Sequence, residues 1–231
     1  MNILICGSTG FIGRNITERL AKNSAFNIIA TYFSSKPLAN PNIQSIKIDL
    51  TSQDEVDKLT ANVDVIIQAA ATTSGSKDIV ERPYIHVTDN AIMNSVILRS
   101  AFKNKVKKFI FLSCSVMYSS SKFAIKESDF KENNHVTDKY FGVAWTKIYI
   151  EKMCEFYSNL NTTKHLVIRH SNIYGPYDKF DLDKSHVFGA TVNKVMNKKS
   201  PSLIVWGSGK ETRDLLYVDD LLDFIEIAIL K

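Results

Sequence analysis

The sequence has few cysteines and no long apolar segment. Its three cysteines, Cys6, Cys114 and Cys154, are scattered over 231 residues and form no CxxC pair, which excludes a disulfide framework and a cysteine-based metal site. No apolar run reaches membrane-spanning length. The first ten residues, MNILICGSTG, have the pattern of a strand that enters a loop, not of a signal peptide. We therefore expect a cytoplasmic, reducing compartment, no bound metal and no membrane partner.

The sequence also lacks a strong charge imbalance. The net charge is +5 with 23% charged residues, which is ordinary for a globular protein. The densest basic run, KNKVKK at 103–108, contains no aromatic residue. This pattern favours a solvated face before a strand over a nucleic-acid site, so no nucleic-acid partner is expected.

Short apolar runs alternate with amphipathic stretches through the first three quarters of the chain. This alternation predicts an α/β fold with a Rossmann-type doubly wound parallel sheet, covered on both faces by helices. Residues 1–175 would form this dinucleotide-binding domain. The predicted strands are 2–6, 26–33, 43–50, 63–71, 107–115 and 165–175, and the predicted helices are 11–23, 52–61 (with Ser52 as N-cap), 89–104 and one from about residue 140.

The pattern loosens from residue 176 onward. A turn-rich stretch leads into a predicted helix at 187–199, a strand at 202–209 and a helix at 217–230. We expect residues 176–231 to form a separate C-terminal region, interleaved with the last elements of the sheet. The 45% of hydrophobic residues suffice for one core plus part of a second.

The segment GSTGFIG (7–13) follows the first strand and opens the first helix. Gly7 permits a tight turn, Gly10 permits the backbone to approach a pyrophosphate, and Gly13 permits close packing of helix on strand. The exposed amides at the start of the helix then bind the anion. The spacing and its context predict a dinucleotide site whose loop also includes Thr9, Phe11 and Ile12.

The second strand does not end in an acidic residue. An NAD site usually has one there, to bind the ribose 2′-hydroxyl. Instead the chain offers Ser34 and Lys36, with Arg14 just past the glycine loop. Hydroxyls and cations suit a 2′-phosphate, so we favour NADP(H) over NAD(H). The alternative is that Lys36 and Arg14 are solvated surface charges.

Several motifs together resemble the extended short-chain dehydrogenase/reductase (NAD-dependent epimerase/dehydratase) family. They are the glycine loop, Asp49-Leu50, the alanines 69–71 and YVDDL at 217–221; the stretches 89–96, 172–187 and 206–221 are most similar to its GDP-L-fucose synthase branch. The resemblance implies a nucleotide-sugar substrate held between the sheet and a C-terminal substrate lobe, which residues 176–231 would form and which would be small and incomplete. It also implies further cofactor contacts, from Asp49, Leu50, Ala69, Ala70, Ala71, Asn90 and Lys147, the last on the nicotinamide ribose. Members continue beyond the YVDDL helix and dimerise through two helices, here 88–104 and 141–158, so we expect a homodimer.

The same resemblance implies a set of substrate residues. His186 matches the acid used in epimerisation, and Asn172 matches a substrate-binding asparagine. Lys194 falls where the branch has a basic residue near the substrate. Trp206 and Arg213 match residues at the nucleotide end, and the planar fork of Arg213 suits a pyrophosphate.

Three positions depart from the family pattern. Val143 stands where a tyrosine precedes the lysine by four residues, Cys114 where a serine polarises the sugar carbonyl, and Val116 where a cysteine partners the histidine. In the family the lysine lowers the phenol pKa so that the phenol can exchange a proton with the sugar oxygen, which valine cannot do.

Substitutes for the missing groups lie nearby. Tyr140 is two helical turns before Lys147 and would be catalytic if its ring folds inward; the alternative is a boundary aromatic. Cys114 could itself donate a weak hydrogen bond to the sugar carbonyl; the alternative is that it is only a small buried side chain. A slip of one residue would bring Ser113 or Ser115 into the serine position, and we favour Ser115. His186 is the best remaining acid, or else a structural histidine. We expect Glu151 to pair with Lys147 one turn away.

These observations predict an NAD(P)-dependent nucleotide-sugar reductase, epimerase or dehydratase with an atypical active site. The alternative is a catalytically silent protein that binds NADP and a nucleotide sugar and acts as a partner or regulator.

Overall fold

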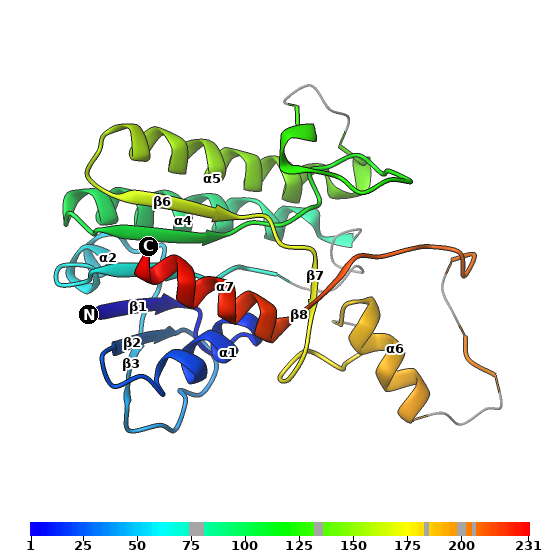
Figure 1. The fold of residues 1–231 in the computed structure, drawn as a ribbon, viewed down its shortest axis with the longest axis horizontal. Helices are drawn as coiled ribbons and strands as arrows, with labels where there is room; N and C mark the ends of the chain where they lie inside the picture. The colour runs from blue at the N-terminus through cyan, green and yellow to red at the C-terminus, as the bar shows by residue number, and fades with distance from the viewer. Residues whose placement is uncertain (74–80, 132–135, 183–184, 198–201, 205–206) are drawn as a thin grey trace.

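A six-stranded parallel sheet forms the centre of the protein (Figure 1). The computed structural model describes residues 1–73, 81–131, 136–182, 185–197, 202–204 and 207–231. The sheet has the strand order β3-β2-β1-β4-β5-β6, which confirms the predicted doubly wound sheet. Its strands are β1 (Asn2–Cys6), β2 (Asn27–Tyr32), β3 (Ile43–Lys47), β4 (Val65–Gln68), β5 (Lys108–Leu112) and β6 (Lys164–Ile168).

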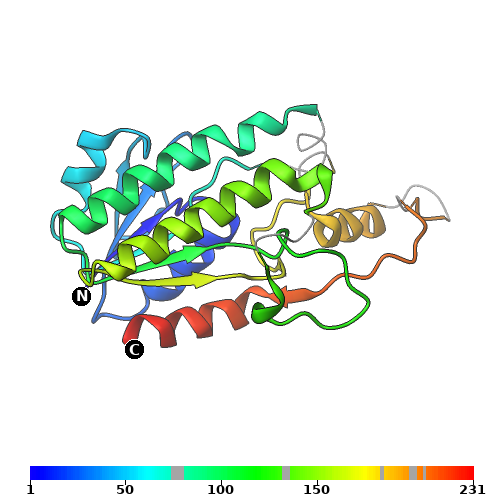
Figure 2. The ribbon, with the colours of Figure 1, turned by 90° about the horizontal axis from the view of Figure 1, so that it is seen from above.

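Helices cover both faces of the sheet (Figure 2). One face carries α1 (Phe11–Leu20) and α7 (Val218–Leu230), and the other carries α2 (Gln53–Leu59), α4 (Thr88–Lys103) and α5 (Phe141–Asn159). Alternation along β5 explains this division, because Ile110 and Leu112 pack with the first group and Phe109 and Phe111 with the second. The last helix, α7, therefore contributes to the same core as β1.

The strand order reverses between β1 and β4. These two strands are paired, with Cys6 opposite Gln68 at their carboxyl ends. In open parallel sheets the crevice outside such a switch point is where ligands bind. The loops that follow β1 and β4 are therefore the first place to look for a site.

A second, two-stranded sheet lies beyond the main one. It pairs β7 (Asn172–Tyr174) with β8 (Leu215–Tyr217), next to α6 (Val187–Met196). The single strand predicted for 165–175 is thus wrong: β6 ends at Ile168, and the polar residues 169–171 separate it from β7. The strand predicted for 202–209 is also absent from the described residues of that stretch, where Gly207 and Gly209 adopt left-handed φ values of 90° and 76°.

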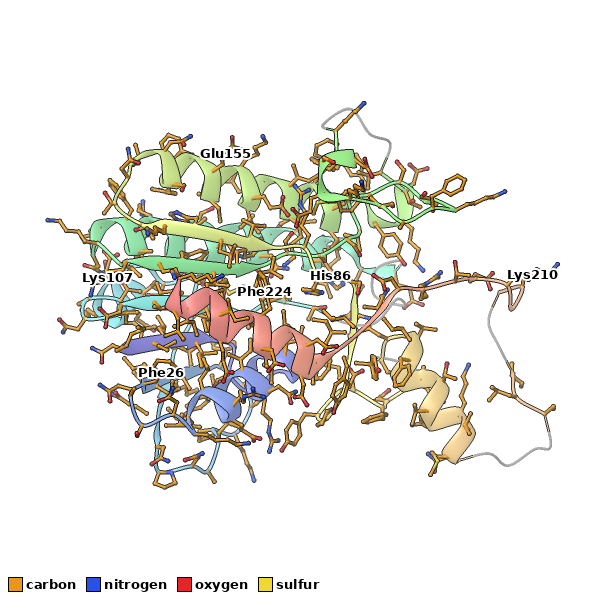
Figure 3. All side chains as sticks on the ribbon, in the orientation of Figure 1. Phe26, His86, Lys107, Glu155, Lys210 and Phe224 are labelled. Carbon is orange, nitrogen blue, oxygen red and sulfur yellow. The ribbon has the colours of Figure 1, made fainter. Side chains whose placement is uncertain are left out.

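The basic run 103–108 serves the fold. Lys103 and Lys107 pair with Asp57 and Asp64 at 2.6 and 2.7 Å. The Lys108 ammonium donates to the carbonyls of Ala228 and Ile229 at the end of α7, at 2.6 and 3.0 Å, where the helix dipole favours a cation. Lys107 lies at the end of the molecule opposite α6 (Figure 3). In the described part of the chain, every helix is too short or too polar to cross a bilayer.

At α2, Ser52 occupies the predicted N-cap position, but its side chain makes no capping hydrogen bond within the described residues.

Candidate active site

The glycine loop wraps tightly around the carboxyl end of β1. Gly7 has a φ of 78°, and a Cβ there would lie 2.6 Å from the Ala70 Cα. A Cβ on Gly13 would lie 2.1 Å from the Gly7 carbonyl oxygen. Gly10 is the exposed N-cap of α1, and among the described residues no side chain caps this helix and its first turn has no acid. The free amides of α1 therefore point into the switch-point crevice, as an anion site requires.

Arg14 is not a solvated charge. Its Nε donates to Glu18 Oε1 at 2.8 Å, and its guanidinium carbon lies 3.7 Å from the centre of the Tyr177 ring. The Tyr177 hydroxyl donates to the other Glu18 oxygen at 3.0 Å. Hydrogen bonding to Glu18 raises the pKa of Arg14 and partly compensates its charge. Ser34 and Lys36, by contrast, are exposed after the end of β2.

The loops after β3 and β4 border the same crevice. Asp49 is exposed and accepts hydrogen bonds from the Thr51 amide and hydroxyl at 2.9 and 2.7 Å, which lower its pKa, while Leu50 is buried. The Asn90 side chain accepts from the Thr72 amide and donates to the Thr72 and His86 carbonyls, at 2.9 to 3.0 Å. Asn90 thereby fastens the segment that contains Ala69, Ala70 and Ala71 to α4.

Lys147 reaches from α5 to the carboxyl end of β5. Its ammonium donates to the Leu112 carbonyl at 2.8 Å and lies 4.6 Å from the centre of the Phe111 ring. Burial lowers the pKa of Lys147, and nearby Cys114 and Glu151 oppose this shift. Val143, one turn earlier, is half-buried and supplies no proton-exchanging group.

Glu151 does not form its main pair with Lys147, so that prediction is wrong. Its carboxylate accepts from Arg169 Nη2 and Nε at 2.6 and 3.0 Å, and from the Ser113 hydroxyl. The physical reason is that the Arg169 fork reaches the carboxylate from the neighbouring strand, while Lys147 is drawn to the end of β5.

The loop after β5 places Cys114 within the electrostatic influence of Lys147. Cys114 is half-buried; burial raises its pKa, and the charge of Lys147 acts in the opposite direction. Ser115 is exposed and its carbonyl accepts from the Tyr118 amide at 3.1 Å. Val116 packs in a small apolar cluster with Met117 and Ile148.

Two tyrosines near the site differ in their surroundings. The Tyr118 hydroxyl accepts from Arg169 Nη1 at 2.8 Å, and its ring packs edge-on against Phe130, which gives it a structural role. Tyr140 is half-buried and lies directly before α5, as its N-cap. The Lys139 ammonium lies 5.5 Å from the centre of the Tyr140 ring.

His170, which the sequence interpretation missed, lies in the same neighbourhood. Burial lowers its pKa to about 4, and the charges of Lys147 and His186 contribute. His186 is the exposed N-cap of α6, and its charge acts on Asp178 as well. The sequence did contain a signal for His170, because polar residues directly after a buried parallel strand are typical of ligand sites.

The residues expected to bind substrate are spread over the second sheet and its surroundings. The side-chain amide of Asn172 donates to the Asp214 carbonyl at 3.1 Å, across the β7–β8 pair. The Lys194 ammonium donates to the Ile204 carbonyl at 3.1 Å. Arg213 is exposed and bonds to the Thr212 carbonyl, on a segment that extends away from the sheet, as Lys210 illustrates (Figure 3). Trp206 lies outside the described residues.

A cavity of about 310 Å³ opens between β7, β8 and α6. Its walls are mostly apolar and aromatic: Tyr174, Gly175, Pro176, Asp178, Phe180, Phe188, Val192 and Tyr217. Burial raises the pKa of Asp178, the one carboxyl group among these lining residues. No group of three His, Cys, Asp or Glu side chains in the described ranges is arranged to hold a metal ion.

Comparison with known proteins gives a consistent result. The GDP-L-fucose synthase of Sinorhizobium fredii is 31% identical over 99% of this chain and 70% of its own length. The GDP-L-colitose synthase of Yersinia pseudotuberculosis is 27% identical, over 99% and 72%. The solved UDP-glucuronic acid 4-epimerase from Bacillus cereus, in complex with UDP-glucuronic acid and NAD, matches with a TM-score of 0.85 at 25% identity, over 100% of this chain and 74% of that one.

A UDP-glucose 4-epimerase from Thermotoga maritima has the same fold, with a TM-score of 0.85 at 24% identity over 99% and 73% of the two chains. The model of the NAD dependent epimerase/dehydratase family matches residues 3–231. The relatives of this chain that are named above are nucleotide-sugar synthases and epimerases. By sequence and by fold, the chain belongs to the NAD-dependent epimerase/dehydratase family.

Proposed function

We propose that this protein binds NADP(H) and a nucleotide-linked sugar and acts at the sugar C4 oxygen as a reductase, epimerase or dehydratase. The observation that carries this proposal is the position of Lys147. Its ammonium is delivered to the carboxyl end of β5, on the same edge of the sheet as the free amides that follow Gly10. A cation and an anion-binding helix start on one edge suit the two ends of a dinucleotide.

The residues present fit a dinucleotide. The loop from Gly7 to Gly13 (with Thr9, Phe11 and Ile12) would hold the pyrophosphate, and Asp49, Leu50 and Ala69–Ala71 would border the adenosine. The exposed Ser34 and Lys36 favour a 2′-phosphate, although Arg14 is already paired with Glu18. When bound, the cofactor supplies or accepts hydride; Lys147 would bind the hydroxyls of its nicotinamide ribose.

Among nucleotide sugars, we favour a guanosine nucleotide sugar as the substrate. Support comes from the relatives that make GDP-L-fucose and GDP-L-colitose. Asn172, His186, Lys194, Trp206 and Arg213 are the proposed substrate contacts, with Arg213 on the pyrophosphate. Cys114, Ser115, Tyr140 and His186 are the candidates for polarising the sugar oxygen or moving its proton.

We also expect a homodimer formed through α4 and α5. These two helices lie side by side on one face of the sheet (Figure 2). They expose large apolar side chains, among them Ile92 (45%), Tyr149 (47%) and Phe156 (59%), and a partner copy would cover them. Light scattering of the purified protein should give twice the mass of one chain.

A catalytically silent binding protein is the second candidate. The observation that favours it is Val143, which leaves Lys147 without a phenol one turn away. In that case the protein would bind NADPH through the intact loop and lysine but turn over no substrate.

Binding and turnover separate the two candidates. NADPH and NADH affinities are measured by fluorescence titration, and NADPH oxidation is then followed with GDP-4-keto-6-deoxymannose and dTDP-4-keto-6-deoxyglucose. We expect tighter binding of NADPH and turnover of the GDP sugar. Lys147→Met should weaken NADPH binding, whereas Lys152→Met, an exposed lysine of the same helix paired with Glu155, should not.

Three outcomes would revise the proposal. Tight binding with no turnover of either sugar transfers the function to the silent candidate, and no dinucleotide binding at all rejects both. A Tyr140→Phe variant with the full wild-type rate removes Tyr140 from the catalytic candidates.

A further inference from the structure

His170 and Cys114 leave the sheet at equivalent positions on neighbouring strands. In the β5–β6 pair Leu112 lies opposite Ile168, and the ladder continues with the Ser113 amide donating to the Ile168 carbonyl at 2.8 Å. Cys114 lies two residues after Leu112, and His170 lies two residues after Ile168. Cys114 matches the serine that polarises the sugar carbonyl in the resembled family, so His170 lies next to the position where that oxygen is expected.

Two other side chains of the site act on His170. The charges of the Lys147 ammonium, from α5, and of His186, at the start of α6, both lower its pKa. Lys147 also acts on Cys114. The electrostatic environment of His170 therefore includes the lysine proposed for the nicotinamide end of the crevice and the histidine proposed for the substrate lobe.

The orientation of the His170 ring is fixed by its backbone. Nδ1 lies 2.8 Å from the Ser171 carbonyl oxygen. A carbonyl only accepts, so Nδ1 carries the hydrogen and the neutral ring keeps its lone pair on Nε2. Among the described residues, the structure gives Nε2 no hydrogen-bond partner.

From this arrangement we infer that His170 Nε2 is the proton-exchanging group at the sugar oxygen, taking the role that the tyrosine absent from position 143 has in the family. The inference rests on the proposed function and names the group that the function requires. His170 would touch the substrate directly, with Lys147 beside it on the cofactor.

The proton balance is simple. In the oxidising direction the hydroxyl O–H bond breaks, its proton goes to His170 Nε2, a C=O bond forms and the hydride leaves the carbon for the bound nicotinamide. Reduction runs the same bonds in reverse, with Nε2 returning the proton to the new alkoxide. The neighbouring Lys147 charge repels the imidazolium, which favours return of the proton.

The test combines kinetics with histidine NMR. In His170→Gln we expect kcat to fall by about 10²-fold or more, the contribution typical of general acid–base catalysis. KM and NADPH affinity should change little. Free imidazole should restore part of the rate of His170→Ala. Glutamine keeps an N–H donor for the Ser171 carbonyl, and thermal unfolding checks that the variant is folded.

His165→Gln is the matched control. This histidine also lies on β6 with its Nδ1 2.9 Å from a backbone carbonyl, that of Thr163, but it is at the amino-terminal end of the strand between Phe109 and Tyr157. Its substitution should leave kcat within about threefold, since it has no access to the reacting oxygen.

The NMR readout does not depend on turnover. In the wild type, NADP⁺ together with GDP-L-fucose should shift the His170 ring resonances and leave those of His165 in place. Unshifted His170 resonances, or a His170→Gln variant with wild-type kcat and an unchanged pH profile, would overturn the assignment. Failure of the wild type to bind NADPH would instead reject the proposed function.

Discussion

Arg169 donates two hydrogen bonds to the same carboxylate oxygen of Glu151, from Nη2 at 2.6 Å and from Nε at 3.0 Å. The pair joins β6 to α5, and the side chains are only 20% and 10% exposed. Arg169 also donates to Tyr118, and Glu151 also accepts from Ser113. One ion pair thus ties the loop after β5, the helix of Lys147 and the strand that leads to His170 into a fixed arrangement.

Removing one partner of this pair should destabilise the protein strongly. In Glu151→Ala, Arg169 is left as a partly buried charge with no counter-ion, and we expect a loss of about 3 kcal/mol in the free energy of unfolding. Urea denaturation measures it. Glu155→Ala, one turn further on the same helix and 62% exposed, should change stability by less than about 0.5 kcal/mol. Equal effects of the two substitutions would contradict a structural role for the Glu151–Arg169 pair.

The glycine loop permits a prediction that separates fold from binding. A Cβ on Gly13 would lie 2.1 Å from the Gly7 oxygen, while one on Gly10 would meet the same oxygen at 3.5 Å, an ordinary contact. Gly13→Ala should therefore lower both thermal stability and NADPH affinity. Gly10→Ala should keep the stability and lose affinity only, because its new methyl group would lie on the exposed loop that is proposed to hold the pyrophosphate. A stable Gly13→Ala that binds NADPH normally would show that the loop moves.

These residues show what sequence patterns can and cannot predict. The β1–loop–α1 unit was predictable because its pattern is local. Its glycines are required by close contacts with atoms a few residues away or on the next strand. The partner of Glu151 was not, because Arg169 reaches it from the next strand, 18 residues away. His170 was missed because residues 165–175 were interpreted as one strand, which hid the polar break where the chain leaves the sheet.

Position 143 offers a gain-of-function prediction. Val143 lies one turn before Lys147 on the same helix face, so Val143→Tyr restores the tyrosine–lysine spacing of the family. If the site has no other proton donor, NADPH oxidation with GDP-4-keto-6-deoxymannose should rise by about 10²-fold, whereas His170 acting as the donor would leave little rate to gain. Val143→Phe adds the same ring without the hydroxyl and should show no gain. A wild-type rate already higher than that of Val143→Tyr would indicate that the site has adapted to a different proton donor.

The depressed pKa of His170 predicts how stability depends on pH. Its value falls from an ordinary 6.5 to about 4 in the folded protein, chiefly through burial and further through the Lys147 and His186 charges. Between these two values the unfolded chain binds a proton that the folded chain does not, so the free energy of unfolding must decrease as the pH falls. At 1.36 kcal/mol per pKa unit, His170 accounts for a loss of at most about 3 kcal/mol across this window.

His170→Gln removes that contribution and should flatten the pH dependence. The comparison is made by urea unfolding of the wild type and the variant at about pH 7 and about pH 5, where only the difference between the two proteins is interpreted. His165 and the carboxylates titrate alike in both and cancel. The stability of the wild type should fall more steeply than that of His170→Gln. Parallel curves would mean that the pKa of His170 is not lowered in the folded protein, which would contradict its burial near the Lys147 and His186 charges.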